Sequence, residues 1–476
     1  MPTDRADRAN RAATIADTPV GPVVGRAGDG VLRFGGVPYA RAARFEVAAP
    51  TAWTEPLDCT QPGPAPPQTV DGLDLVPGMV PARQEEDCLT AEITTTSLDG
   101  RRPVIVWVPG GSYRIGGAAL AVYDGAALAR DGAVVVGLNY RLGALGWLAA
   151  DGVPTNLALR DLRAAIAWVR DVAPAFGGDP DRVVLMGESA GSGMLAHVLA
   201  TGDVPVAGAI LQSGAPAGTL DAETAAWVAD QFLAAAGVVR ASELRAAPVG
   251  ALLDAQAQTV VTALGKVGMM PFHPWVDGDL LHDTPVRAVL APVPLVVGTT
   301  AHEMELFREQ VPELPEEVAI PYLAPKAAAL GVRGEAAVRA AFAAAGGDLV
   351  EAVADLELHL PNDLLSRAHR ARGNRVWNYR FDWEAPGRRA CHALDLPFTF
   401  GTLDSDTWRD FAGAHDPAAD ALSARMRSAW IAFARDGAPA DAVIGAWPED
   451  GLVHLGRGDA VGPDAVSARI EIWTGA

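Results

Sequence analysis

The chain has 476 residues, of which half are hydrophobic and a fifth are charged, a composition typical of a protein with a large buried core. Its formal net charge of −20 argues against a surface for nucleic acid or for an anionic membrane, because both would repel an acidic protein. No apolar run is long enough to span a bilayer, and the first residues contain no apolar segment of a signal peptide. We therefore expect a cytoplasmic protein, a monomer or weak homo-oligomer, that binds neither nucleic acid nor membrane.

The cysteines and the N-terminal residues bear on the compartment and on the domain boundaries. Cys59, Cys88 and Cys391 are too few and too scattered for a disulfide framework or a metal site, which favours a reducing compartment. Residues 1–19 are rich in Arg, Asp and Ala, and we expect them to form a disordered tail. The rest of the chain shows no repeat and no low-complexity linker, which predicts one domain over residues 20–476.

Short β-rich runs alternate with longer helical segments along this domain. Val104–Val108 and Ala133–Asn139 are continuous apolar runs, as expected of strands buried on both faces. Asn156–Val172 has apolar residues at helical spacing, and Val183–Met186 is the next strand. Further predictions are strands at Ala207–Leu211, Pro294–Gly298 and Val376–Phe381, an edge strand at Ile470–Trp473, a helix at Ala418–Arg435 and a surface loop at Pro62–Gln68. This alternation predicts an α/β fold with a mostly parallel sheet and helices on both faces.

The segment Gly187-Glu188-Ser189-Ala190-Gly191 connects the strand Val183–Met186 to the helix that follows it. A serine flanked by small residues at such a turn has a strained backbone, and its hydroxyl projects at the carboxyl end of the sheet. The alternative is a glycine-rich turn with an incidental serine. The position between a strand and a helix favours a nucleophile at Ser189.

This turn is one of a series of segments that extends from Val23 almost to the C-terminus. The others are Phe34–Ala40, Glu86–Leu89, Asn139–Gly146, Phe176–Pro180, Ala209–Gly214, Asp277–Gly278 and Asp395–Phe398. In this order they resemble the type B carboxylesterases, the family that includes the cholinesterases. The resemblance implies an α/β-hydrolase fold with helical insertions and an ester-hydrolysing activity.

The resemblance also implies a base for the serine. His392–Phe398 is similar to the family's catalytic-histidine segment. We therefore expect His392 to take the proton of Ser189 during attack and to return it to the leaving alcohol. His302 and His415 are the alternatives for this role.

The third member of a triad should be a carboxylate between the serine and the histidine in the chain, which is the α/β-hydrolase order. Glu303 fits, because Gly298–Glu303 follows a predicted strand and resembles the family's segment that ends in Asp-Glu-Gly. In this chain His302 replaces the Asp and the Gly is also replaced, so Glu305 remains an alternative. Ser213 matches a family position beside the acid, and we expect it to hydrogen-bond that carboxylate.

An acyl-transfer site also needs backbone N–H groups that stabilise the developing oxyanion. One donor is expected from Ala190, the residue after the nucleophile. The resemblance places the others at Gly111 and Ser112, in a loop where the family usually has His-Gly-Gly-Gly and this chain has Pro109-Gly110-Gly111-Ser112. Pro109 removes a side chain that anchors the loop, and Ser112 adds a Cβ where many members have only hydrogen.

The family's extracellular members have a disulfide near the N-terminus. Cys88 matches one half of it, but the region of its partner reads Pro66-Pro67-Gln68. We expect Cys59 to be free, in agreement with an intracellular enzyme.

The expected reaction is hydrolysis of a small or medium, largely apolar ester through an acyl-enzyme, with no metal and no organic cofactor. Acyl transfer or lactone chemistry with the same triad is the main alternative, because the oxyanion loop is altered. A non-catalytic adhesion or scaffold protein is a remote one. The predicted insertions, roughly Thr219–Pro271 and Met304–Asn374, supply the walls of the substrate pocket. The candidates to line it are Tyr113, Phe272, Trp275 and Phe398, and for each of them packing in the core is the alternative.

Overall fold

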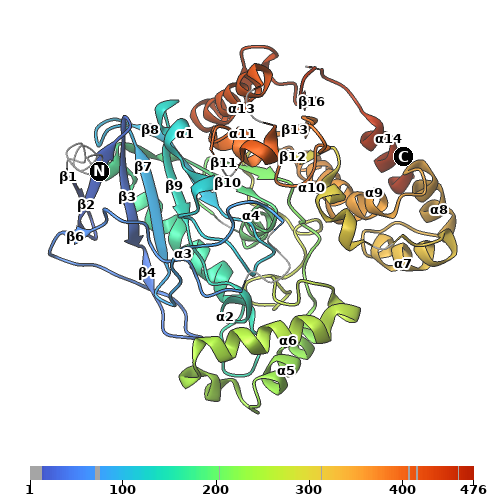
Figure 1. Ribbon diagram of the computed structural model, residues 1–476, viewed down its shortest axis with the longest axis horizontal. Helices are drawn as coiled ribbons and strands as arrows, with labels where there is room; N and C mark the ends of the chain where they lie inside the picture. Colours follow the sequence, from blue (N-terminus) through green and yellow to red (C-terminus); the bar gives the residue numbers. More distant parts are fainter. Residues whose placement is uncertain are drawn as a thin grey trace, which may run out of the picture.

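The computed structural model describes residues 13–69, 75–202, 204–311, 313–405, 408–413, 416–458 and 460–475. One large sheet runs through the molecule (Figure 1). Its strands, in their order across the sheet, are β1 (Ala13–Thr18), β2 (Gly21–Gly28), β3 (Val31–Pro38), β7 (Thr90–Thr95), β9 (Val134–Leu138), β8 (Arg102–Val108), β10 (Gly178–Glu188), β11 (Gly208–Gln212), β12 (Leu295–Thr300), β13 (Val376–Phe381) and β16 (Leu452–Leu455), and β6 (Leu57–Asp58) pairs with β2. The pairings from β1 to β9 are antiparallel, and those from β9 to β16 are parallel. The predicted fold, with its mostly parallel central sheet, is confirmed.

The central strands separate two hydrophobic cores, because successive side chains of a strand point to opposite faces. In β8, Val104, Val106 and Val108 belong to one core, whereas Ile105 and Trp107 belong to the other. The first core lies under α3 (Leu157–Val172) and α4 (Ala190–Ala200), and the second under α1 (Ala126–Arg130), α11 (Leu396–Phe400) and α13 (Pro417–Asp436). Since both faces are covered, the strands carry apolar residues without alternation.

Two helical insertions extend from this three-layered body. The first is a helical hairpin of α5 (Ala222–Ala235) and α6 (Val249–Val267), which projects from one side of the molecule (Figure 1). The second runs through α7 (Glu316–Ala329), α8 (Glu335–Ala344), α9 (Leu349–Ala354), the π-helix η5 (Asp355–His359) and α10 (Leu360–Ala371). The remaining elements are the short helices α2 (Gly143–Trp147), α12 (Arg409–Ala412), η1 (Ala121–Tyr123), η2 (Ala173–Phe176), η3 (Ala241–Ala246) and η4 (Glu303–Gln310), the pair β4 (Ala40–Arg41) and β5 (Ala49–Pro50), and the pair β14 (Ala440–Asp441) and β15 (Gly445–Ala446).

Two predictions about the ends of the chain are wrong. Ile470–Trp473 is not an edge strand but part of helix α14 (Ala465–Thr474), which begins where the carboxylate of Asp464 accepts the backbone N–H of Ser467. Its apolar side chains pack against α7, α8 and α9 in a third small core. The tail predicted for residues 1–19 is partly ordered, because Ala13–Thr18 pairs with β2 along its whole length; residues 1–12 lie outside the described part of the chain.

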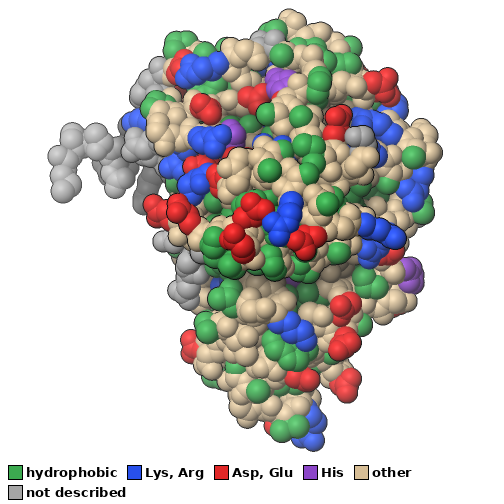
Figure 2. All heavy atoms as spheres, turned by 90° about the vertical axis from the view of Figure 1, so that its right-hand side faces the viewer, with side chains coloured by type: hydrophobic (Ala, Val, Ile, Leu, Met, Phe, Trp, Pro, Cys, Tyr) green, Lys and Arg blue, Asp and Glu red, His purple; other side chains and the backbone are tan. Residues whose placement is uncertain are grey.

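The face that carries the second insertion and α14 bears acidic, basic and hydrophobic side chains side by side, and no single charge sign covers it (Figure 2). All three cysteines are buried and free. Among the residues that the structure describes, no helix has the length and apolarity needed to cross a membrane.

Candidate active site

Ser189 lies between the end of β10 and the start of α4 in a strained conformation, with φ 56° and ψ −126°. The neighbouring glycines make this turn possible. A Cβ on Gly191 would collide with the carbonyl oxygen of Val108, and one on Gly187 would lie 2.8 Å from the carbonyl carbon of Gly191. The backbone N–H of Ser189 donates to Gln212 O at 2.9 Å, which fixes the turn against β11. Ser189 itself is partly exposed, so its hydroxyl is open to a substrate.

His392 and Glu303 form a buried pair. Nδ1 of His392 lies 2.6 Å from Oε2 of Glu303, and the carboxylate has no exposed surface. The other carboxylate oxygen accepts the backbone N–H of Thr300 at 2.8 Å, which aims the side chain inward from the end of β12. Because the carboxylate accepts the Nδ1 proton, Nε2 of His392 is left to act as an acceptor.

Glu305, the alternative acid, faces a different way. Its carboxylate accepts the Nε–H of Arg308 at 2.8 Å and lies 3.8 Å from a guanidinium nitrogen of Arg389. The segment is a 3₁₀ helix, in which residues two apart point in different directions. The structure thus brings Glu303 to the histidine and leaves Glu305 in an ion-pair cluster.

A further carboxyl group, which the sequence analysis did not single out, lies against the other side of the imidazole. Oε1 of Glu188 is 3.2 Å from Nε2 of His392, without the geometry of a hydrogen bond. Burial raises the pKa of Glu188 above its usual range. Burial alone would lower the pKa of His392, but the charges of Glu188 and Glu303 outweigh it and raise that pKa. Nε2 of His392 thus faces the carboxyl group of the residue that immediately precedes the serine in the chain.

Asp395 belongs to the same polar interior. Its Oδ2 accepts an N–H of Gln212 at 2.9 Å, and Gln212 also donates to the hydroxyl of Thr399 at 3.1 Å. Burial and the nearby charge of Glu303 raise the pKa of Asp395. Asp395 is thus one of the buried carboxyl groups near the imidazole whose charge acts on the pKa of His392.

The loop after β8 brings backbone N–H groups toward the serine. Gly110 lies so close that a Cβ on it would be 3.1 Å from Cβ of Ser189. Gly111 has φ 115° and Ser112 has φ 55°, both in the region that favours glycine. In the part of the chain that the structure describes, the N–H groups of Gly111, Ser112 and Ala190 donate to no protein acceptor. They are free to bind an oxyanion.

The oxyanion loop is anchored without the histidine that Pro109 replaces. The hydroxyl of Tyr140 donates to Pro109 O at 2.8 Å. The side chain of Gln68 accepts the N–H of Gly116 and donates to its carbonyl oxygen, both at 2.8 Å. Most of the predicted surface loop Pro62–Gln68 is accordingly buried, because it lies beneath this loop. The prediction for that segment is wrong.

The residues predicted to line the pocket are mostly core. Phe398 is fully buried between Phe381 and Trp383, with ring centroids 5.1 and 5.5 Å away. Phe272 is buried against Phe232 at 5.6 Å. An aromatic ring that the sequence analysis missed, Phe307, lies 6.0 Å from the ring of His392 and is partly exposed.

The other two predicted lining residues lie in loops. Tyr113 is buried, stacks on His273 at 6.0 Å and has no hydrogen-bond partner for its hydroxyl. Trp275 is partly exposed, and its backbone pairs with the side chain of Asn156 at the start of α3. Tyr113 is therefore a buried residue of the oxyanion loop itself, where it follows Ser112. Trp275 remains a predicted lining residue.

Two further predicted residues have other surroundings than expected. Ser213 is buried, but its hydroxyl has no hydrogen-bond partner, so the expected hydrogen bond to the acid is not formed. The carboxylate of Glu303 accepts the backbone N–H of Thr300 instead. His302 is bound to Glu351 and Arg389 and does not face the serine. His415 lies outside the described residues.

One group in the described residues has the donor atoms of a metal site: Asp382, His454 and Asp464. These donors already have partners. His454 pairs with Asp382 and contacts Gly462 O at 2.9 Å, and Asp464 accepts from the side chains of Arg380 and Ser467. We therefore regard the group as an ion-pair network.

Comparisons with known proteins agree with this geometry. The model of the carboxylesterase family matches residues 12–321. The chain is 34% identical to the para-nitrobenzyl esterase of Bacillus subtilis (strain 168) over 91% of this chain and 92% of that protein. It is 32% identical to a probable N-octanoylanthranilate hydrolase of Rhodococcus erythropolis over 94% of this chain and 98% of that one. A solved structure of a thermophilic pNB esterase superimposes with a TM-score of 0.84 and 30% identity, covering 97% of this chain and all of that one.

Fold and relatives together define the class of protein, a hydrolase with an α/β architecture. The chain belongs to the carboxylesterase family.

Proposed function

We propose that this protein hydrolyses small or medium, largely apolar carboxylic esters with a Ser189–His392–Glu303 triad. The observation that carries the proposal is the 2.6 Å contact between His392 Nδ1 and a completely buried Glu303, which leaves Nε2 as the base beside the strained serine turn. A carboxylate in this position fixes the imidazole tautomer and stabilises the imidazolium that forms during attack.

In the proposed reaction, Nε2 of His392 takes the hydroxyl proton of Ser189 while Oγ bonds to the carbonyl carbon of the ester. The carbonyl oxygen becomes an oxyanion, which accepts hydrogen bonds from the N–H groups of Gly111, Ser112 and Ala190. The tetrahedral intermediate collapses, the bond to the alcohol breaks, and His392 returns the proton to the departing alcohol. Water then attacks the acyl-enzyme by the same sequence of proton transfers and releases the acid.

The preference for apolar esters rests on Phe307, which lies beside the histidine and is partly exposed. The names of the relatives point to different substrates, among them para-nitrobenzyl esters and N-octanoylanthranilate. The family alone therefore does not select a substrate. Transfer of the acyl group to an alcohol is tested in the same assay, by adding the alcohol and measuring which product forms.

The test is hydrolysis of p-nitrophenyl acetate and butyrate by the wild-type protein and by Ser189→Ala. We expect the variant to lose activity by at least about a thousandfold, because no other group can form the acyl-enzyme. Ser192→Ala is the matched control, since Ser192 is buried in the same helix and makes no hydrogen bond. Full activity in Ser189→Ala would contradict the proposal.

A further inference from the structure

The segments that carry the proposed acid and base are joined outside regular secondary structure. The backbone N–H of His302 donates to Ala390 O at 2.9 Å, and that of His392 donates to Glu303 O at 3.2 Å. Ala301 is joined in the same way to the end of β13. These few hydrogen bonds hold Glu303 next to His392, so any further contact between the two segments affects the geometry of the pair.

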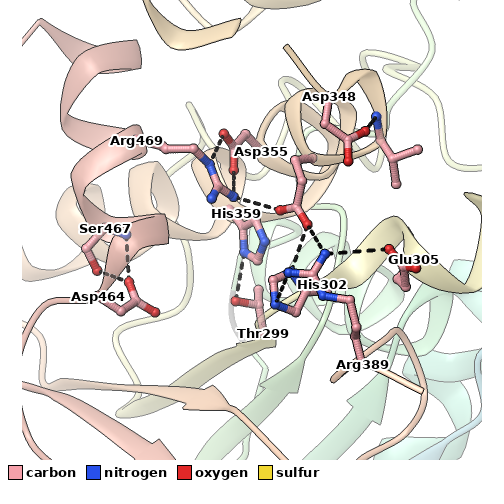
Figure 3. Close-up of polar contacts among 12 residues, drawn as sticks. Thr299, His302, Glu305, Asp348, Asp355, His359, Arg389, Asp464, Ser467 and Arg469 are labelled. Carbon is pink, nitrogen blue, oxygen red and sulfur yellow. Dashed lines mark hydrogen bonds and ion pairs between the residues drawn. The ribbon is translucent and has the colours of Figure 1, made fainter. Parts of the chain in front are cut away.

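The side chains of His302 and Arg389 form such a contact (Figure 3). His302 precedes the acid by one residue, and Arg389 precedes the base by three. A guanidinium N–H of Arg389 donates to Nε2 of His302 at 2.7 Å. Nδ1–H of His302 donates in turn to Oε1 of Glu351 at 2.7 Å. An acceptor at Nε2 and a donor at Nδ1 require a neutral imidazole in one defined tautomer.

Glu351, on α9, binds both members of this contact. Its Oε1 also lies 3.2 Å from Nη1 of Arg389, and its Oε2 receives Nη2 of Arg469 at 3.1 Å. Arg469, on α14, makes two further hydrogen bonds of 2.9 Å to Asp355 (Figure 3). The guanidinium groups of Arg389 and Arg469 are thus surrounded by carboxylates of Glu351, Asp355 and Glu305, and the partly buried network is tied to helices of the second insertion and to α14.

We propose that His302 and Arg389 are positioning residues that hold Glu303 within hydrogen-bonding distance of His392. We call the two side chains together the 302–389 clamp. This inference rests on the proposed function, because it concerns the efficiency of the same triad. Among the described residues, the side chains of His302 and Arg389 bind each other, Glu351 and Glu305, and not Ser189, His392 or Glu303. Loss of the clamp should therefore lower kcat and leave substrate binding unchanged.

The experiment compares His302→Phe, Arg389→Gln and the double variant with wild type in hydrolysis of p-nitrophenyl butyrate. Phe keeps the ring volume but has no polar atom, and Gln cannot bridge His302 and Glu351. We expect each single variant to lower kcat about tenfold, in the range typical of residues that orient a catalytic group, with KM within about twofold of wild type. Because the two side chains act as one unit, the kcat of the double variant should be no lower than that of the less active single variant.

Two controls separate positioning from general stability. Arg375→Gln removes a guanidinium that is as exposed as that of Arg389, 51% against 44%, and that pairs with Glu449 away from the clamp. It should keep wild-type kinetics. His302→Gln keeps one acceptor and one donor on the side chain and should recover most of the lost kcat.

The low-field proton NMR resonance of His392 Nδ1–H gives a readout that does not depend on turnover. It should shift or broaden in His302→Phe and Arg389→Gln and stay unchanged in Arg375→Gln. If His302→Phe fails to fold, Arg389→Gln decides the question, because its side chain is partly exposed and easily replaced.

Wild-type kcat in folded Arg389→Gln, or an unshifted Nδ1–H resonance of His392 in that variant, would contradict the positioning role of the 302–389 clamp. A loss of kcat that only follows a loss of folded protein would overturn it as well. These outcomes are distinct from failure of the proposed function, which would appear as undiminished hydrolysis by Ser189→Ala.

Discussion

The imidazole of His392 lies between two carboxyl groups, Glu303 at Nδ1 and Glu188 at Nε2. The first orients the ring, and the second lies 3.2 Å from the nitrogen that we propose as the base. The charges of Glu188 and Glu303 raise the pKa of His392 despite its burial, so we expect the base to become neutral only at a higher pH than a free histidine.

The pH dependence of kcat/KM follows from this arrangement. The base must be neutral, so activity should rise with pH through an apparent pKa above 6.5, the ordinary value for histidine. Glu188→Gln removes one negative charge, lowers the pKa of His392 and should move this rise to lower pH. The check is kcat/KM for p-nitrophenyl butyrate from pH 5 to 10. If kcat/KM rose with pH in the same way in wild type and in Glu188→Gln, the charge of Glu188 would not set the pKa of His392.

The assignment of the acid is also tested with single residues. Glu303→Gln should lower kcat at least about a hundredfold, because the amide can hold the wrong imidazole tautomer, a change that costs about four orders of magnitude in a related triad. Glu305→Gln should stay within about threefold of wild type, since Glu305 faces Arg308. Steady-state kinetics on the two variants decide the matter, and the reverse pattern would transfer the role to Glu305.

The oxyanion loop shows how far an element can be predicted from sequence. Its position after β8 could be predicted, because the buried strand and the glycines are local features. Its anchors could not, because Gln68 and Tyr140 reach the loop from distant parts of the chain. Helix α14 illustrates the opposite case: Asp464-Ala465-Val466-Ser467 is a local helix-capping pattern, and it marks the start of a helix where an edge strand was expected.

The loop also makes a prediction about substrate shape. Ser112 has a positive φ that glycine adopts without strain, so Ser112→Gly should fold and should remove a Cβ from the oxyanion site. We expect the ratio of activity on a tertiary-alcohol ester to activity on a primary one to rise in this variant. The measurement is kcat/KM on tert-butyl and n-butyl acetates. An unchanged ratio would exclude steric control by Ser112.

For the whole molecule, the parallel strands from β9 to β13 and the helices on both faces could be predicted from apolar runs and helical spacing, whereas the antiparallel strands β1 to β7 and the pocket walls could not. Phe272 and Phe398 were predicted to line the pocket from residue type alone, but both fill the core. The contacts that join the second insertion to the sheet, such as Arg469 to Asp355, link residues far apart in sequence and leave no local pattern.

This long-range contact has a consequence for stability. Asp355 is fully buried and Arg469 nearly so, and removal of one partner leaves a buried charge unpaired. Arg469→Ala should therefore lower the free energy of unfolding by about 3–5 kcal/mol, as measured by urea denaturation. Arg339→Ala, which breaks an exposed ion pair with Glu335, should change it little. Equal effects of the two variants would contradict the structural role of α14.

The central claim is that Ser189 is the nucleophile, and covalent labelling tests it most directly. The protein is treated with a fluorophosphonate, digested, and the modified residue is located by peptide mass spectrometry. If the claim holds, one adduct forms, on Ser189, and its formation runs parallel to the loss of esterase activity and is slowed in Glu303→Gln. An adduct on another residue that accompanies inactivation, or full activity with Ser189 completely labelled, would contradict it.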